Sequence, residues 1–242
     1  MSVPPVHLCS FGTIPEYTPL LDRLRIEATA SGYFASFTAY TQETLPVTDA
    51  ERAFILANPR GYGYWTWKVI LLLDMLSKVP EGDIVLYVDA GCGIRTTPKA
   101  RECMNLWIHT VLLHPTHRVA FQLRHLARHW TKMDIFQEFH ATDPVITDSG
   151  QHMGGIQIYQ NTTANRMFLQ LYRQALSRRN YRLVDDSPSI APNFPGFVEN
   201  RHDQAILSVL YKKLGVASFP DHCDGPDSPV KVHCQRAIQI PR

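Results

Sequence analysis

The sequence lacks the long apolar runs and the charge imbalance that mark several large protein classes. No stretch approaches the ~20 apolar residues of a membrane span, and the N-terminus has neither the basic nor the apolar segment of a signal peptide. We therefore expect a soluble, cytoplasmic protein. The 24 basic residues nearly balance the 22 acidic ones, for a formal net charge of +2. This balance does not favour a nucleic-acid binder or a polybasic membrane anchor.

Cysteine is sparse and shows no disulfide-framework spacing, which favours a reducing compartment. The five cysteines are Cys9, Cys92, Cys103, Cys223 and Cys234. The neighbouring pairs His222-Cys223 and His233-Cys234 suggest zinc, but their spacing matches none of the usual zinc-site patterns. A G-x-S-x-G nucleophile elbow, a Walker loop and a G-x-G-x-x-G turn after the first strand are also missing, so those catalytic classes are not indicated.

An unbroken apolar run at residues 84–88 is the clearest element that is present. It is bounded by Gly82-Asp83 before and by Asp89 after, which is typical of a strand buried on both faces of a sheet. Ligands of open α/β sheets bind beyond the carboxyl ends of the strands, so we expect Asp89 to face a ligand crevice. Gly91 and Gly93 would let the backbone approach that ligand or adopt positive φ.

The segment before this strand predicts a helix whose apolar face packs on the sheet. That face comprises Trp65, Val69, Leu72, Leu73 and Leu76. Gly61 and Gly63 precede the helix, and Lys68 lies near its first turn. A helix N-terminus with a nearby lysine suits a phosphate group. The alternative is that Lys68 is a solvated helix lysine beside core tryptophans.

Strands and helices alternate along most of the chain, which predicts one α/β domain over the 242 residues. A strand at 6–11, a helix at 15–31 and a strand at 33–40 form a Rossmann-like opening. The other predicted helices are 98–113, 130–139, 162–178 and 200–214, and the other strands are 118–123 and 156–159. The principal loops are 41–60, which has room for one helical turn, and 185–198.

Four blocks together carry a family resemblance. They are residues 60–68, RGYGYWTWK, residues 87–92, YVDAGC, residues 153–155, MGG, and residues 201–204, RHDQ. In this order they resemble small GT-A glycosyltransferases of bacterial and viral polysaccharide pathways. The resemblance implies a GT-A-like α/β fold with a mixed, mostly parallel sheet flanked by helices. It also implies a nucleotide-sugar-binding half at about 1–125 and an acceptor half at about 126–242.

The implied activity is hexosyl or deoxyhexosyl transfer from a nucleotide-diphosphate donor, most plausibly a UDP-sugar, to a carbohydrate or glycoconjugate hydroxyl. The implied donor-binding residues are Ser10, Phe11, Gly12, Tyr64, Trp67, Lys68, Asp89, Ala90 and Gly91. Asp89 would also hold Mn²⁺ or Mg²⁺ on the diphosphate. Gly91 replaces the second aspartate of the usual motif, so Lys68 together with the helix N-terminus is an alternative means of neutralising the diphosphate without metal. In the tail, His222 or Asp224 could supply a distant metal ligand.

On the acceptor side, the resemblance implies binding by Met153, Gly154 and Gly155 and catalysis by His202, Asp203 and Gln204. An inverting transferase needs a base for the attacking hydroxyl, and Asp203 is the first choice. The alternative candidates for this base are Asp148, Asp185 and Asp186. In a retaining enzyme no protein base is required, and Gln204 would lie beside the donor sugar.

Plainer interpretations remain open for the same residues. Asn200 and Asp203 have the spacing of a helix cap with an acidic third residue, His202 also suits a core histidine, and Gly154-Gly155 suits a turn. Two other functions also remain. A non-catalytic nucleotide- or sugar-binding module would bind the donor without turnover. A sugar nucleotidyltransferase would carry a glycine-rich basic loop after its first strand, of which residues 11–15 are a poor version.

Overall fold

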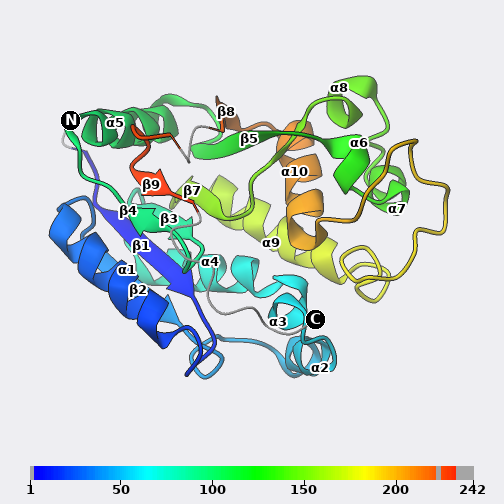
Figure 1. The fold of residues 1–242 in the computed structure, drawn as a ribbon, viewed down its shortest axis with the longest axis horizontal. Coiled ribbons are helices and arrows are strands. Elements are labelled where there is room, and N and C mark those ends of the chain that lie inside the picture. Colours follow the sequence, from blue (N-terminus) through cyan, green and yellow to red (C-terminus); the bar gives the residue numbers. More distant parts are fainter. Residues whose placement is uncertain (1–2, 222–224, 233–242) are drawn as a thin grey trace.

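The apolar run at residues 84–88 forms β3, an interior strand of a seven-stranded sheet with the order β2-β1-β3-β7-β5-β6 and β8 paired to β5. The computed structural model describes residues 3–221 and 225–232. The β1–β2, β1–β3 and β5–β8 pairings are parallel, whereas β7 and β6 run against their neighbours. The sheet is therefore mixed, with five strands in one direction and two in the other, as predicted (Figure 1).

The elements have the following bounds. The strands are β1 (Val6–Phe11), β2 (Ser36–Tyr40), β3 (Ile84–Val88), β4 (Gly93–Ile94), β5 (Arg118–Leu126), β6 (Gly150–His152), β7 (Ile156–Gln160), β8 (Ala217–Pro220) and β9 (Val230–Lys231). The helices are α1 (Thr18–Ser31), α2 (Asp49–Ala57), α3 (Gly61–Tyr64), α4 (Trp67–Lys78), α5 (Pro98–Leu113), α6 (Ala127–Trp130), α7 (Met133–Glu138), α8 (Pro144–Thr147), α9 (Thr163–Ser177) and α10 (His202–Leu214). The short strands β4 and β9 pair with each other outside the main sheet.

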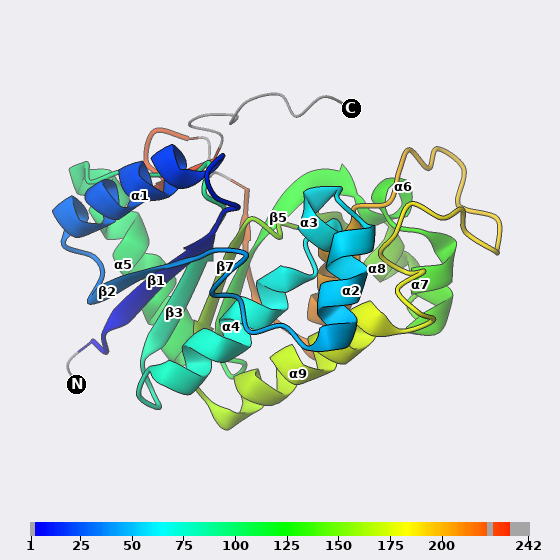
Figure 2. The same ribbon diagram turned by 90° about the horizontal axis from the view of Figure 1, so that it is seen from below.

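Alternate residues of β3 enter two separate cores, one on each face of the sheet. Leu86 and Val88 pack in the core covered by α1 and α5, while Val85 and Tyr87 pack in the core formed with α4, α9 and α10. Figure 2 shows the two sets of helices on opposite sides of the strands. Because side chains alternate along a strand, Asp89, the next residue after Val88, faces the α4 side. The fold thus delivers this carboxylate to the first turn of α4.

Three local predictions are wrong. The segment 41–60 contains α2, whose N-terminus is stabilised by a capping box between Thr48 and Glu51. Trp65 lies outside α4, in a left-handed conformation that ends α3. Asn200 does not cap α10: its amide donates to the Leu183 carbonyl and its oxygen accepts from the Lys132 amide.

Several expectations concern residues that the structure does not describe. His222, Cys223, Asp224, His233 and Cys234 lie outside the described residues. The zinc interpretation, which the spacing disfavours, is therefore untested, and the distant metal ligands His222 and Asp224 stay predictions. Within the described part of the chain, Cys9 and Cys103 have free thiols. No helix found there has the length and apolarity needed to cross a membrane.

Candidate active site

A cavity of about 520 Å³ opens beyond the carboxyl end of β3. Its walls come from both halves of the chain: the segment before α4, the residue after β3, the β6–β7 turn and the first turn of α10. Seven of the sequence-predicted site residues line it, namely Lys68, Asp89, Met153, Gly155, His202, Asp203 and Gln204. Lys68 and Asp203, which are 135 positions apart in the sequence, therefore meet in one cavity.

Lys68 is buried in the wall of this cavity, with 4% of its surface exposed. Its Nζ lies 3.1 Å from Oδ1 of Asp89 and 4.0 Å from Oδ2 of Asp203, and donates to the Gly154 carbonyl at 3.2 Å. Burial alone would lower the pKa of Lys68, but the two carboxylates more than offset it, so the pKa is raised. The interpretation of Lys68 as a solvated lysine is wrong, because the side chain is a buried cation held between two acids.

Asp89 stands at the edge between the protein interior and the cavity, with 47% of its side chain exposed. The Tyr87 hydroxyl donates to Oδ1 at 2.5 Å, and the Asp89 amide donates to the Gly155 carbonyl at 2.9 Å. A Cβ added at Gly155 would lie 2.7 Å from Oδ2. Position 155 must therefore be glycine for the carboxylate to keep this place. Neither Gly91 nor Gly93 has positive φ.

Asp203 is enclosed in the cavity wall with 3% of its surface exposed. Burial raises the pKa of Asp203 to about 7; the Lys68 ammonium opposes the shift and the Asp89 carboxylate adds to it. The Tyr172 hydroxyl lies 3.1 Å from the Asp203 carbonyl and 3.4 Å from Oδ2. This carboxyl group can therefore gain or lose a proton near neutral pH, which is the requirement for a general base or acid.

The Gln204 side chain is fixed by a relay of amides. Its Oε1 accepts from the Gly154 amide at 2.9 Å, and its Nε2 donates to Oε1 of Gln151 at 2.8 Å. Gln151 in turn donates to the Trp130 carbonyl at 2.7 Å and to the Thr131 hydroxyl at 2.8 Å. These contacts orient the amide of Gln204 toward the cavity without any ligand.

His202 begins α10 with a φ of +50°, and its ring packs against Tyr64 and Trp65 at centroid distances of 5.0 and 5.4 Å. Its Nδ1 donates to the Val184 carbonyl at 2.6 Å, since a carbonyl only accepts. Burial lowers the pKa of His202, so the ring is neutral at pH 7 and Nε2 carries a lone pair. This Nε2 is buried and has no hydrogen-bond partner among the described residues. It can therefore accept a hydrogen bond from a ligand.

Residues 61–65 form a continuous left-handed turn, which is rare outside glycine. The φ angles run 57°, 53°, 82°, 52° and 60°, and only Gly61 and Gly63 among the five lack a Cβ. The Trp65 amide donates to the Gly61 carbonyl at 3.1 Å, and Nε1 of Trp67 donates to the same oxygen at 2.9 Å. The strained turn directs Trp65 into the cavity.

The other predicted donor-binding residues do not line this cavity. The Ser10 hydroxyl is fully buried and donates to the Val88 carbonyl, and the Phe11 ring packs on Trp67 at 4.1 Å. The Tyr64 hydroxyl donates to Asp186 at 3.0 Å, and Ala90 packs against the apolar side of α1. The remaining two are Gly12, whose amide donates to the Tyr40 carbonyl, and the half-buried Gly91.

Sequence reasoning missed several residues of the cavity wall. Among them are Trp65, Trp130, Gln151, Glu199 and Arg201. Trp65 was expected on the face of a helix, and Trp130 lies where the periodic signal is weak. The Arg201 guanidinium covers the Trp130 ring at 4.3 Å, a contact between residues 71 positions apart that no local pattern reveals. Of the reserve bases, Asp148 pairs with Arg128 and Asp185 with Lys132.

The predicted metal ligand Asp89 offers one carboxylate, and Oδ1 already contacts Lys68 and Tyr87. Across residues 3–221 and 225–232, no group of three or more His, Cys, Asp or Glu side chains is arranged to hold a metal ion. Mg²⁺ often binds through one or two carboxylates, with phosphate oxygens and waters completing its shell. Asp89 therefore fits a divalent cation only if the donor diphosphate supplies further oxygens.

No family model matches the chain, and no curated protein matches it. Among solved structures, it is similar to a glycosyltransferase involved in glycosylation of the major capsid of PBCV-1, with 13% identity, a TM-score of 0.49, and coverage of 97% of this chain and 96% of that one. It is similar to the galactosyltransferase LgtC solved with donor and acceptor sugar analogues, with 14% identity, a TM-score of 0.48, and coverage of 88% and 72%. Mouse xyloside xylosyltransferase 1 gives 14% identity, a TM-score of 0.45, and coverage of 90% and 85%.

Proposed function

We propose that this protein is a glycosyltransferase that moves a sugar from a nucleotide-diphosphate donor to a carbohydrate or glycoconjugate hydroxyl. The supporting observation is the buried Lys68 ammonium, held between Asp89 and Asp203 in a cavity beyond the carboxyl end of β3. Ligands of open α/β sheets bind in this position. A UDP-sugar is the favoured donor, and hexosyl or deoxyhexosyl transfer the favoured reaction.

Transfer breaks the bond between the sugar C1 and the diphosphate oxygen, and forms a bond from C1 to the acceptor oxygen. The departing diphosphate gains negative charge, which the fixed Lys68 ammonium stabilises without reorganisation. The half-exposed Asp89 accepts hydrogen bonds from the ribose hydroxyls. A divalent cation bound at Asp89 and the phosphates would add Lewis-acid stabilisation of the same charge.

The acceptor hydroxyl must lose its proton as it attacks. In this proposal, Asp203 takes that proton, because a carboxyl group with a pKa of about 7 is well matched to the task at neutral pH. The free Nε2 of His202 accepts a hydrogen bond from the acceptor, and the fixed amide of Gln204 orients the donor sugar. Met153 and Gly155 form the facing wall, with Gly154 behind them bonded to Gln204.

The decisive experiment is calorimetric titration with UDP, GDP and CDP, each in Mn²⁺ and then in EDTA, on the wild type and on Asp89→Asn. We expect one nucleotide, UDP, to bind with Mn²⁺, and the variant to lose that binding at unchanged thermal stability. Asp148→Asn is the matched control, because Asp148 has a similarly exposed side chain (44%) but lies outside the cavity.

Turnover of UDP-sugars separates the proposal from a binding module. Release of UDP from a UDP-hexose, slow in water and faster with an acceptor saccharide, is the expected result. Binding without any release would favour the non-catalytic module, and no binding of any of the three nucleotides would contradict the proposal.

A further inference from the structure

The irregular segment between α9 and α10 encloses a second cavity of about 460 Å³, within the size range of small-molecule sites. It lies inside the loop formed by residues 185–200, which projects from one end of the molecule in Figures 1 and 2. Glu199 lines both this cavity and the larger one. The two cavities are therefore neighbours that share a wall.

The walls of the second cavity are held in place by buried ionic groups. The Lys132 ammonium donates to the carbonyls of Arg182 and Asp185 at 2.9 and 2.7 Å and contacts the Asp185 carboxylate at 3.2 Å. The Asp134 carboxylate accepts from the amides of Ile190 and Ala191. A cavity built this way exists before a ligand binds, so little binding energy is lost to ordering the loop.

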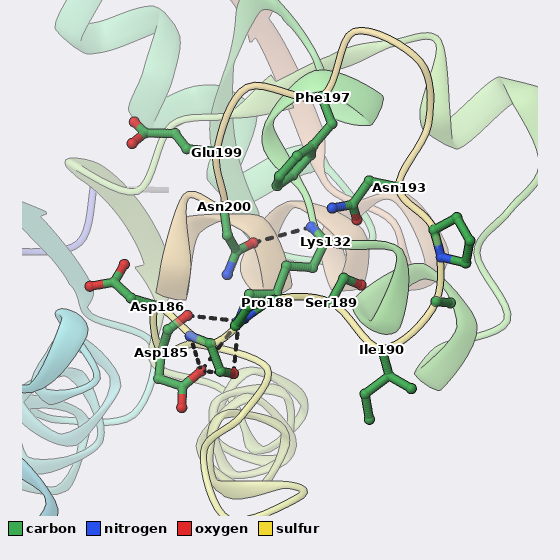
Figure 3. Close-up of a pocket in the computed structure, with 13 residues that line it drawn as sticks. Lys132, Asp185, Asp186, Pro188, Ser189, Ile190, Asn193, Phe197, Glu199 and Asn200 are labelled. Atoms are coloured by element: carbon green, nitrogen blue, oxygen red, sulfur yellow. Dashed lines mark hydrogen bonds and ion pairs between the residues drawn. The ribbon is translucent and has the colours of Figure 1, made fainter.

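The lining chemistry suits a neutral, hydroxyl-rich ring. Figure 3 shows Phe197 and Asn193 turned inward across the loop toward Lys132. The Phe197 ring is half-buried and offers a flat apolar face, while the Asn193 amide offers polar atoms. The carboxylates on the shared side are already neutralised, since Asp186 pairs with Arg60 at 2.6 Å and Glu199 with Arg201 at 3.3 Å. Because both arginines are already paired with these carboxylates, neither is available to neutralise an anionic sugar.

One buried acceptor without a donor lies at the junction of the cavities. Nε2 of His202, in the larger cavity, lies 3.9 Å from Oδ1 of Asp186, in the smaller one. His202 is buried, with 4% of its surface exposed, and nothing in the described part of the chain forms a hydrogen bond with its Nε2. A buried acceptor left unpaired is costly. A ligand hydroxyl at this point could donate to Nε2 of His202, and the proximity of Asp186 places that hydroxyl next to the smaller cavity.

We propose that the loop cavity is a second acceptor subsite, which binds a neutral pyranose unit adjacent to the sugar that carries the attacking hydroxyl. This rests on the proposed glycosyl transfer. The favoured acceptor is accordingly an oligosaccharide of at least two neutral units rather than a monosaccharide, and Phe197 provides the stacking surface for the second unit.

The test is binding of fluorescently labelled protein to an array of defined neutral and uronic-acid mono-, di- and trisaccharides. The wild type should bind a neutral di- or trisaccharide more tightly than its terminal monosaccharide. Phe197→Ala should weaken that binding about tenfold and abolish the preference for length, as expected for loss of a buried aromatic contact. Phe197→Tyr should retain the preference, because the flat ring remains.

Val198→Ala is the matched control, because Val198 is the neighbouring residue, is 62% exposed and does not line the cavity. Equal binding of mono- and oligosaccharides, retention of the length preference by Phe197→Ala, or no saccharide binding at all would each overturn the subsite. UDP calorimetry on the same variants separates this outcome from failure of the proposed function: unchanged UDP binding with no length preference would refute the subsite alone.

Discussion

Asp203 makes the stability of the fold depend on pH in an unusual direction. Because burial raises its pKa from 3.8 to about 7, the folded state binds a proton that the unfolded state has already released between about pH 4 and 7. The free energy of unfolding therefore falls as the pH rises through this window, by up to roughly 2–4 kcal/mol. Most carboxylates with salt-bridge partners act in the opposite direction.

Asp203→Asn replaces the titrating carboxyl group with a neutral amide. The substitution should therefore remove the contribution of Asp203 to the pH dependence of the free energy of unfolding. We expect the free energy of unfolding of the variant, relative to the wild type, to increase from pH 4 to pH 7, because only the wild type must bury a charge beside Asp89 as the pH rises. Urea denaturation of both proteins at several pH values measures the difference. A difference that stays constant across this range would show that Asp203 is not a perturbed acid.

Gly155 and Gly154 give a matched pair of substitutions beside the same cluster. A Cβ at Gly155 would lie 2.7 Å from Oδ2 of Asp89, whereas one at Gly154 would lie 3.3 Å from Cβ of Gln204. The atom that Gly155→Ala would displace is Oδ2, at the end of the movable Asp89 side chain. The fold should therefore be retained while the Asp89 carboxylate moves away from Lys68. We expect Gly155→Ala to weaken UDP binding at least tenfold and Gly154→Ala to weaken it less, by calorimetry. Equal effects would contradict this role of Gly155.

The left-handed turn at residues 61–65 is the element on which the cavity most depends, because it carries Trp65 into the wall and stacks Tyr64 on His202. Gly63 has a φ of +82°, and a Cβ there would lie 2.6 Å from Cγ1 of Ile55 and 3.1 Å from its Cα. In a Gly63→Ala variant, the energetic cost of backbone strain is therefore added to the cost of a collision with α2. Gly63→Ala should lower the free energy of unfolding by about 1–3 kcal/mol.

Gly82→Ala is the control for this substitution. Gly82 has a φ of +92°, but no atom of residues 3–221 or 225–232 lies within 4 Å of an added Cβ, so only the backbone cost of about 1 kcal/mol applies. Chemical denaturation of the two variants separates collision from strain. Equal losses of stability in the two variants would contradict a destabilising collision between the new methyl group at position 63 and α2.

Elements with a strong local signal were predictable from the sequence, and the left-handed turn was not. The apolar run of β3 and the proline start of α5 at Pro98 are local patterns, and both were predicted to the residue. The capping box of α2, Thr48 with Glu51, was a legible signal that was overlooked. In contrast, the pattern from Trp65 to Leu76 has helical spacing although Trp65 is not helical, because Gly61 and Gly63 permit a different local conformation.

The same distinction holds for the site. The position of Asp89 was predictable from the apolar strand before it, and that of Asp203 from a motif at the start of a helix. The burial of Lys68 depends on Gly154 and Asp203, which are 86 and 135 positions away, so no local pattern contains it. The second cavity is formed by a loop without helix or strand, whose shape depends on the remote cations Lys132 and Arg60.

On the scale of the whole molecule, the two halves of the chain share one sheet. Strand β7, from the second half, lies between β3 and β5 of the first and pairs antiparallel with both. Helices α9 and α10, also from the second half, cover the face of the sheet on which α4 packs. The predicted nucleotide-binding half at about 1–125 therefore lacks both a central strand and part of its own core, and we propose a single folding unit.

A fragment containing residues 1–125 tests this directly. Without β7 the edge of β3 is unpaired, and without Gly154 and Asp203 the Lys68 ammonium loses two of its partners. We expect the fragment to lack the near-ultraviolet circular dichroism of the full chain, to unfold without a cooperative transition and to bind no UDP. Mixing it with residues 126–242 should restore part of the signal if the halves complement each other. A dispersed amide NMR spectrum together with UDP binding by 1–125 alone would instead show that the first half is an independent nucleotide-binding domain.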